Sequence, residues 1–144
     1  MARIVLDTNV YILGFQRRVG DEWLTLQRVR QRHDVIVFSR ELEDQIRRVG
    51  RRVGGKDYVG LILNAVWQNL MVDYMLLPDE PFEVTRQFAP SIPAEDVLVF
   101  LTAVLGRVEC LVSTNREFLR HSAAAQRAFR CLTPAEFLAA YPES

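Results

Sequence analysis

The chain has 144 residues, 49% of them hydrophobic and 25% charged, and its formal net charge is zero. This length suits one compact domain over residues 1–144, and the composition excludes the disordered and fibrous classes of protein. The balanced charge gives no overall attraction to nucleic acid or membrane. We expect a cytoplasmic protein, because no basic-then-apolar leader opens the chain and its longest apolar segment, residues 61–77, is interrupted by polar side chains.

The first motif is a short aliphatic run, residues 3–6, that ends abruptly at three polar side chains, Asp7, Thr8 and Asn9. This pattern predicts a buried strand that delivers Asp7 to its carboxyl end. Open α/β sheets bind their ligands at that edge. Asp, Thr and Asn are also typical helix caps, so the motif alone leaves capping and chemistry open.

Later apolar runs and the amphipathic segments between them continue the pattern in chain order. Ser39, Gly106 and the capping box at residues 133–136 mark helix ends. The order of elements predicts a doubly wound α/β fold with a largely parallel five-stranded sheet and helices on both faces. We expect strands at 3–6, 35–38, 74–77, 110–113 and 129–132. We expect a short helix or turn at 8–14, helices at 21–33, 40–56, 57–72, 93–105 and after 115 and 134, and a helical fragment inside 79–93.

Several polar residues follow strands of this predicted sheet. Asp7 follows the first strand, Asp96 opens a helix, and Asn115 lies in the loop after the fourth strand. The carboxyl ends of parallel strands share one edge, so these positions can converge on one acidic pocket. Convergent carboxylates are typical of sites for Mg²⁺ or Mn²⁺.

With these motifs in order, the chain resembles the PIN-domain family of metal-dependent ribonucleases, which includes the toxins of toxin–antitoxin pairs. The resemblance implies a PIN-like endoribonuclease that hydrolyses RNA with Mg²⁺ or Mn²⁺ held by Asp7 and Asp96, and an antitoxin as a protein partner. The matching segments are 4–10, Ser39 with the helix after it, 93–106, 111–118 and the closing segment 132–138.

Two acidic positions of the family pattern are not acids in this chain: Gln45 stands where a Glu is usual, and Asn115 where an Asp is usual. Two remaining aspartates offset one divalent cation, so we expect a one-metal site. The resemblance then implies that Asn115 orients a water and that Glu41, one helical turn before Gln45, replaces the missing acid. The expected supporting residues are Thr8, Asn9, Gln45, Ser113 and Glu117.

The basic run at residues 47–56 has a sharp and a plain interpretation. Arg47, Arg48, Arg51 and Arg52 are candidates for contacts with the RNA backbone, or they form a solvated helix face. Two other functions stay open. One is a PIN-like module that binds RNA or a protein without turnover. The other, an aspartyl-phosphate enzyme, is disfavoured because residue 9 is Asn and no strand-end lysine exists.

Three apolar residues, Leu63, Trp67 and Leu70, are expected on the outer side of their helix, which favours a homodimer unless residues 79–93 cover them. We expect Cys110 and Cys131 to be buried, reduced and unreactive. His33 and His121 each stand alone at a polar helix end, which indicates solvated side chains.

Overall fold

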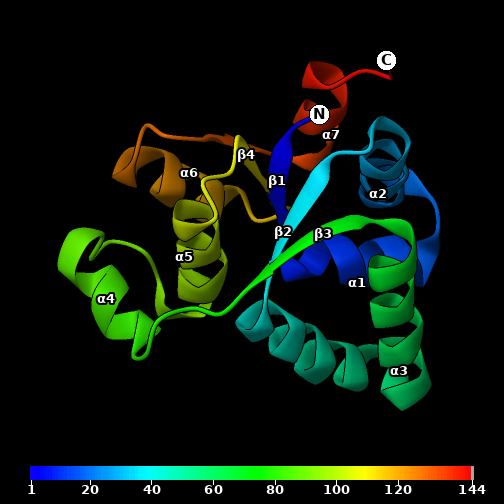
Figure 1. Ribbon diagram of the computed structural model, residues 1–144, viewed down its shortest axis with the longest axis horizontal. Helices are drawn as coiled ribbons and strands as arrows, with labels where there is room; N and C mark the ends of the chain where they lie inside the picture. Colours follow the sequence, from blue (N-terminus) through cyan, green and yellow to red (C-terminus); the bar gives the residue numbers. More distant parts are fainter. Residues whose placement is uncertain (144) are drawn as a thin grey trace.

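The structure, a computed structural model, describes residues 1–143. Its centre is a sheet of five parallel strands in the order β3-β2-β1-β4-β5 (Figure 1). The strand order reverses beside β1, so β1 and β4 flank the point where open α/β sheets bind their ligands. The strands are β1 (Arg3–Leu6), β2 (Val35–Ser39), β3 (Met71–Met75), β4 (Cys110–Val112) and β5 (Arg130–Leu132).

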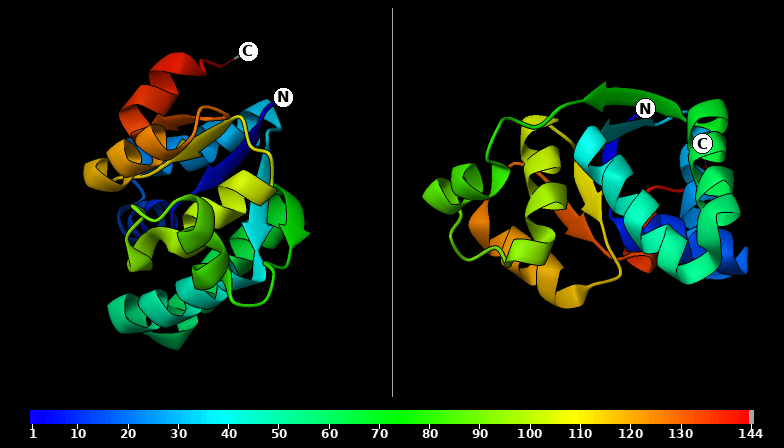
Figure 2. Two further views of the ribbon diagram at one scale, coloured as in Figure 1. Left: turned by 90° about the vertical axis from the view of Figure 1, so that its left-hand side faces the viewer. Right: turned by 90° about the horizontal axis from the view of Figure 1, so that it is seen from below.

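Helices cover both faces of this sheet. On one face α1 packs against α2 and α3, and α2 packs against α7. After β3, the direction in which strands are added to the sheet reverses, and β4 lies on the other side of β1. Because crossovers are right-handed, this reversal places α5 on the opposite face, over β1 and β2. Figure 1 and Figure 2 show that α4 packs on α5, on the side away from the sheet. The helices are α1 (Thr8–Arg17), α2 (Gly20–Arg32), α3 (Arg40–Asn69), α4 (Pro81–Phe88), α5 (Val97–Leu105), α6 (Arg116–Ala125) and α7 (Pro134–Ala140), with a 3₁₀ turn η1 (Ala94–Asp96).

The predicted doubly wound α/β fold is confirmed, and the three inner strands explain why it could be predicted. Almost every residue of β1, β2 and β4 is buried, because helices cover both faces. Ser39 caps α3 by accepting the N–H of Leu42, and Thr133 and Glu136 form the predicted capping box. Both cysteines have free thiols; Cys110 is buried as expected, whereas Cys131 is only partly buried because it lies in the edge strand β5. Burial raises the pKa of Cys110 to about 12 and that of Cys131 to about 11.

The predicted third strand is wrong in its bounds. It begins at Met71, three residues before the expected start at Tyr74. The apolar run 74–77 was a misleading signal, because β3 is an edge strand and most of its side chains are exposed. An edge strand does not need the continuous apolar sequence of an inner strand.

The region of α3 also differs from expectation. The expected helices 40–56 and 57–72 follow each other directly in α3, which bends at Gly55, whose φ of 84° is in the left-handed region that favours glycine. The bend turns the second half of α3 back toward the core, so Leu63 is buried and the prediction that it faces outward is wrong. Trp67 is exposed, and its ring contacts Phe38 and Tyr74.

Two smaller expectations need comment. Asp96 lies in the 3₁₀ turn just before α5 and not in the first turn of that helix. The helical fragment expected within 79–93 is α4. Across residues 1–143, no helix is both long and apolar enough to cross a bilayer. The strand order reverses beside β1, so the candidate site is expected at the polar edge of the sheet next to that strand.

Candidate active site

Asp7 lies directly after β1 and is 8% exposed. Its backbone N–H donates to the carbonyl of Val112, which ties it to the end of β4. One carboxylate oxygen accepts the N–H of Thr8 at 2.7 Å and the other accepts the hydroxyl of Ser113 at 2.6 Å. Asp7 is therefore the cap of α1 and is fixed at the junction of β1 and β4, which confirms the capping interpretation of the first motif, while its chemical role stays a prediction.

A chain of hydrogen bonds fixes the surroundings of Asp7. Ser113 donates to Asp7 and accepts the backbone N–H of Asn115 at 3.0 Å. The side-chain oxygen of Asn115 caps α6 by accepting the N–H of Phe118. On the other side of Asp7, the hydroxyl of Thr8 donates to the side-chain oxygen of Gln45 at 2.9 Å. Gln45, where a Glu is usual in the family, is thus adjacent to the residue after Asp7.

Asp96 is the second carboxylate at this edge and is 9% exposed. Burial, together with the negative charges of Asp7 and Glu95, raises its pKa to about 6. Within residues 1–143 we find no hydrogen bond donated to this carboxylate and no salt bridge to it. Burial raises the pKa of Asp7 as well, against the opposing effect of Ser113. The charges of Asp7 and Asp96 thus act on each other, and within the described residues no cationic side chain forms a salt bridge with either; that the two hold a metal together stays a prediction.

The donor set fits one divalent cation. Each oxygen of Asp7 accepts one hydrogen bond, which leaves a lone pair on each, and the oxygens of Asp96 are free. In residues 1–143 no group of three His, Cys, Asp or Glu side chains forms a ready metal cluster. Mg²⁺ is commonly bound by one or two carboxylates and completes its shell with water and substrate phosphate. The residues therefore suit a two-carboxylate site and not a cage built by the protein alone.

Glu41 is engaged elsewhere. One of its carboxylate oxygens accepts the backbone N–H of Leu77 at 2.9 Å, which ties the start of α3 to the segment after β3. The charges with the largest effects on the pKa of Asp96 are those of Asp7, Glu95, His121 and Glu117. Its expected role as a replacement acid stays a prediction. Asn9 is exposed beside the site, and its expected supporting role is untested as well.

Two ionisable residues of α6 act on the charge of Asp96. The charge of Glu117 raises the pKa of Asp96, and that of His121, one helical turn later, lowers it. His121 is half-buried, and its Nδ1 atom is buried without a hydrogen-bond partner in the described chain. The prediction of a solvated side chain is therefore wrong for His121 and confirmed for the exposed His33. Glu117 and His121 are four residues apart, so they lie on one face of the helix that follows Asn115. This spacing is the sequence signal for that face.

The four arginines predicted to contact RNA are exposed on α3. Arg47 is seven residues into the helix and Arg52 twelve, so the group lies about 10–18 Å along α3 from its start near the sheet edge. Arg47 also lies near Glu43, with 3.9 Å between nitrogen and oxygen. The four arginines thus lie farther along α3 than the end that faces the sheet edge. Their contact with RNA stays a prediction.

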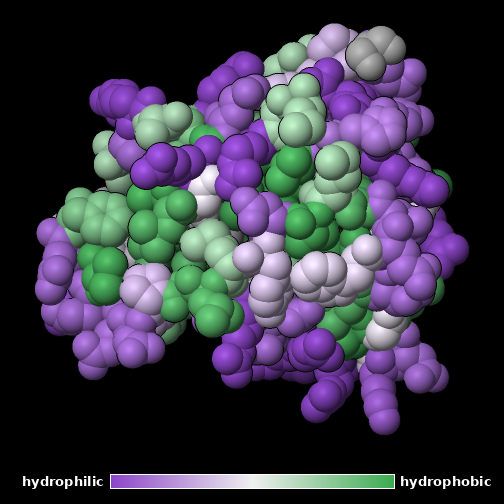
Figure 3. Space-filling model, viewed as in Figure 1, coloured by the Kyte–Doolittle hydropathy of each residue, from purple (hydrophilic) through white to green (hydrophobic). Residues whose placement is uncertain are grey.

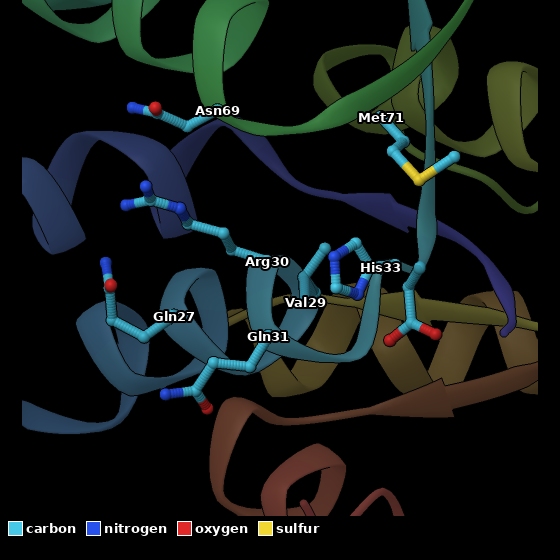
Figure 4. Close-up of a pocket in the computed structure, with 8 residues that line it drawn as sticks. Gln27, Val29, Arg30, Gln31, His33, Asn69 and Met71 are labelled. Atoms are coloured by element: carbon cyan, nitrogen blue, oxygen red, sulfur yellow. The ribbon is translucent and has the colours of Figure 1, made fainter. Parts of the chain in front are cut away.

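A different hollow, of about 390 Å³, lies at the opposite, amino edge of the sheet. Figure 4 shows it between α2 and the start of β3, with the side chains of Gln27, Gln31 and Asn69 around it. Its carboxylate, Asp34, accepts the N–H of Ala2 and is paired with Arg32. The carboxylate of this hollow is already paired and its other charged lining side chain, Arg30, is cationic, so the hollow lacks the free acidic oxygens of a metal site.

Comparison with known proteins supports the fold. Neither a protein-family model nor a curated protein matches the chain. The chain is similar to a chain in the solved structure of VapBC2 from Rickettsia felis bound to a DNA fragment from the promoter. The match has a TM-score of 0.63 and 14% sequence identity, and it covers 91% of this chain and 98% of the other. At this identity the likeness shows the fold alone. The chain thus has a PIN-like α/β fold, with Asp7 and Asp96 at the edge where such a fold binds its ligands.

Proposed function

We propose that this protein is a metal-dependent endoribonuclease of the PIN type, the toxin of a toxin–antitoxin pair. The observation that carries the proposal is the carboxylate of Asp96, buried beside Asp7 with no donor from the described chain. Bringing two such charges together is unfavourable for folding alone, whereas a bound divalent cation compensates them. The shared fold with a VapBC2 structure supports the toxin role.

The chain's own residues have distinct tasks in this proposal. Asp7 and Asp96 hold Mg²⁺ or Mn²⁺. Ser113 and the N–H of Thr8 fix the Asp7 carboxylate in one orientation, so that its free lone pairs point in a constant direction. The bound cation would polarise the scissile phosphate and lower the pKa of a water. Asn115, whose amide nitrogen is not used in capping α6, orients that water, and Gln45 holds Thr8 in place.

Purified protein incubated with structured and single-stranded RNA in Mn²⁺ tests the proposal. We expect cleavage in Mn²⁺ or Mg²⁺, none in a chelator, and a loss of at least a hundredfold in rate for Asp7→Asn and for Asp96→Asn. Asp34→Asn is the matched control, because it changes a buried aspartate at the opposite edge of the sheet. Melting curves of each variant separate loss of catalysis from loss of folding.

The outcomes are distinct. Cleavage that persists in Asp7→Asn indicates a contaminating nuclease, and a folded wild-type protein that cuts no RNA contradicts an active enzyme. In that second case the alternative applies: a PIN-like module that binds RNA or a protein partner without turnover. Gln45 and Asn115 favour this alternative, since amides contribute no charge to a second cation.

The proposed partner is an antitoxin, and its binding is measurable without RNA. A small protein encoded beside this gene, co-expressed and co-purified in a stable complex, would support the toxin role. A homodimer is a further proposal, although Leu63 is buried and only Trp67 of the three predicted contact residues is exposed. Solution mass at micromolar concentration decides between monomer and dimer. The cytoplasmic location stays a prediction.

A further inference from the structure

The strand β3 forms one edge of the sheet, and within residues 1–143 it pairs with β2 alone. In an edge strand, the N–H and C=O groups of every second residue point away from the sheet and can pair with another strand. In the right-hand view of Figure 2, β3 runs along the outside of the molecule, and no helix or strand of the described chain lies beyond it. A second strand therefore has access to this edge.

The edge lacks the features with which natural proteins protect such strands, namely lysine, proline, a bulge or an unpaired charge. Its five residues are Met-Val-Asp-Tyr-Met, and all of them pair with β2 in continuous register. The one charged side chain, Asp73, forms a salt bridge with Arg3 at 2.9 Å, so the edge carries no net charge. An edge of this kind is a template for pairing with another chain.

Two aromatic side chains lie beside this edge in a fixed arrangement. Trp67 is 45% exposed and Tyr74 is 40% exposed, and their ring centres are 5.2 Å apart. The indole N–H of Trp67 and the hydroxyl of Tyr74 both donate to the carboxylate of Glu43, at 3.1 Å each. Their polar atoms are thus already bonded, and the exposed remainder of each ring is apolar. Pre-organised Trp and Tyr side chains contribute most of the binding energy in many interfaces.

Met71 and Leu76 extend this apolar surface along β3, since both side chains are exposed. Figure 3 shows hydrophobic and near-neutral residues across the middle of this face, where Figure 1 places β3. Residues 79–93 leave Trp67 exposed, because their helix α4 packs on α5 instead. The surface is therefore open along its length.

We propose that β3 pairs with β3 of a second copy of this chain, antiparallel and about a two-fold axis at Tyr74. The two five-stranded sheets then form one continuous sheet across the dimer. A two-fold axis perpendicular to a sheet makes the paired edges antiparallel and identical, so each copy covers the edge of the other. The inference rests on the homodimer proposed above, for which it supplies the surface, and it is independent of RNA cleavage.

Charge and register favour a second copy as the occupant of this edge. An axis at Tyr74 places this ring opposite its own copy and Val72 opposite Leu76 of the partner subunit, on the face that carries Trp67. Such aromatic and aliphatic pairs across antiparallel strands are stabilising. Asp73 lies opposite Met75 of the partner subunit, so no like charges meet there. The net charge of zero adds no repulsion between the copies.

The geometry also sets the strength and the consequence of the contact. One strand edge with a few exposed apolar side chains is smaller than the interface of an obligate dimer, so we expect a dissociation constant of about 1–100 µM. Because the paired strands are antiparallel, the carboxyl edge of one sheet continues as the amino edge of the other. The two acidic pairs therefore face opposite directions, and each acts alone.

Sedimentation of the full chain between about 1 and 200 µM tests the dimer. Tyr74→Lys puts a protective lysine on the edge and removes an aromatic contact, so we expect the dissociation constant to rise by about thirtyfold or more. Trp67→Ala leaves β3 itself unchanged and raises it by about tenfold. Leu24→Lys is the matched control, because Leu24 is an exposed leucine of α2, and it leaves the dissociation constant unaltered. Melting curves confirm that each variant is folded.

Two further measurements locate the contact. Hydrogen exchange in residues 71–76 of the wild type slows as the concentration rises, because the outward N–H groups become hydrogen-bonded, and it does not slow in Tyr74→Lys. Oxidised Tyr74→Cys forms a covalent dimer, whereas Val72→Cys does not, because only a residue at the axis lies opposite its own copy.

The results separate this inference from the other proposals. A wild type that stays monomeric at about 200 µM overturns it. A dimer whose dissociation constant is the same in Tyr74→Lys forms through another surface, and β3 is then wrong. Exchange in residues 71–76 that slows only when the antitoxin is added makes the edge a docking site for that protein and overturns the second copy as its occupant. Tyr74→Lys keeps the RNA cleavage of the wild type, so a chain that dimerises in this way but cuts no RNA contradicts the ribonuclease alone.

Discussion

Buried carboxylates at the two edges of the sheet differ in whether the protein supplies them with partners. At the amino edge, Asp34 is 1% exposed, accepts the N–H of Ala2 at 2.8 Å and pairs with Arg32 at 3.0 Å. At the carboxyl edge, Asp7 and Asp96 are nearly as buried, and within residues 1–143 no cationic side chain forms a salt bridge with either. A compensated carboxylate serves the fold, whereas an uncompensated pair is tolerated where a ligand supplies the missing charge.

The largest expected difference between the edges is in stability. Asp34→Ala leaves Ala2 and Arg32 without their acceptor and lowers the free energy of unfolding by about 3 kcal/mol. Asp96→Asn removes a charge without breaking a hydrogen bond, so in the absence of metal it raises the free energy of unfolding by about 1 kcal/mol. Urea unfolding at pH 7.5 in a chelator measures both. Destabilisation by Asp96→Asn would contradict the view that this carboxylate is uncompensated.

The gain in stability from a divalent cation is the next expected difference between the two edges. At a hundredfold excess over the dissociation constant, Mn²⁺ raises the free energy of unfolding of the wild type by about 2.7 kcal/mol, because only the folded state brings Asp7 and Asp96 together. Asp96→Asn loses this gain. Asp34→Asn keeps it, since its side chain is at the other edge. Calorimetric melting with and without Mn²⁺ measures the gain; an equal gain in Asp96→Asn would place the cation elsewhere.

The comparison also explains which parts of the site could be predicted from the sequence. Asp7 follows an aliphatic run that is buried on both faces, and Asp96 precedes a helix with a clear apolar pattern, so short segments of sequence were enough. The convergence of Asp7 and Ser113 followed from the rule that parallel strands share an edge.

Features that depend on packing between distant segments could not be predicted. The contact of Glu41 with Leu77 depends on where the edge strand β3 begins, and β3 lacks the continuous apolar run that identifies inner strands. His121 of α6 acts on the charge of Asp96, which is distant in the sequence, and no local sequence pattern reveals that relation. The burial of Leu63 depends on the bend at Gly55, a single residue in a long helical pattern.

The dependence of stability on pH is a third difference. The pKa of Asp96 is about 6 in the folded state and near 3.8 when unfolded, so between these values the folded state binds a proton that the unfolded state releases. The free energy of unfolding, without metal, therefore falls as the pH rises from about 4 to about 6, by about 1–2 kcal/mol from this group. The wild-type curve minus that of Asp96→Asn isolates this contribution, and a difference that rises with pH contradicts it.

The smallest expected effect concerns the two histidines, one at each edge. His33 ends α2 at the amino edge and is exposed, whereas His121 lies near Asp96 and lowers its pKa. His121→Gln removes that opposing charge, so we expect the pKa of Asp96 to rise by a few tenths of a unit above its wild-type value of about 6. His121→Lys keeps a positive charge and reverses the sign of the change, while His33→Gln leaves this pKa unaltered. Carboxyl-carbon NMR titration resolves shifts of this size. An unchanged pKa in both His121 variants would show that His121 contributes nothing to the electrostatics of the acidic pair, and burial with the charges of Asp7, Glu95 and Glu117 would then account for the displacement of the Asp96 pKa.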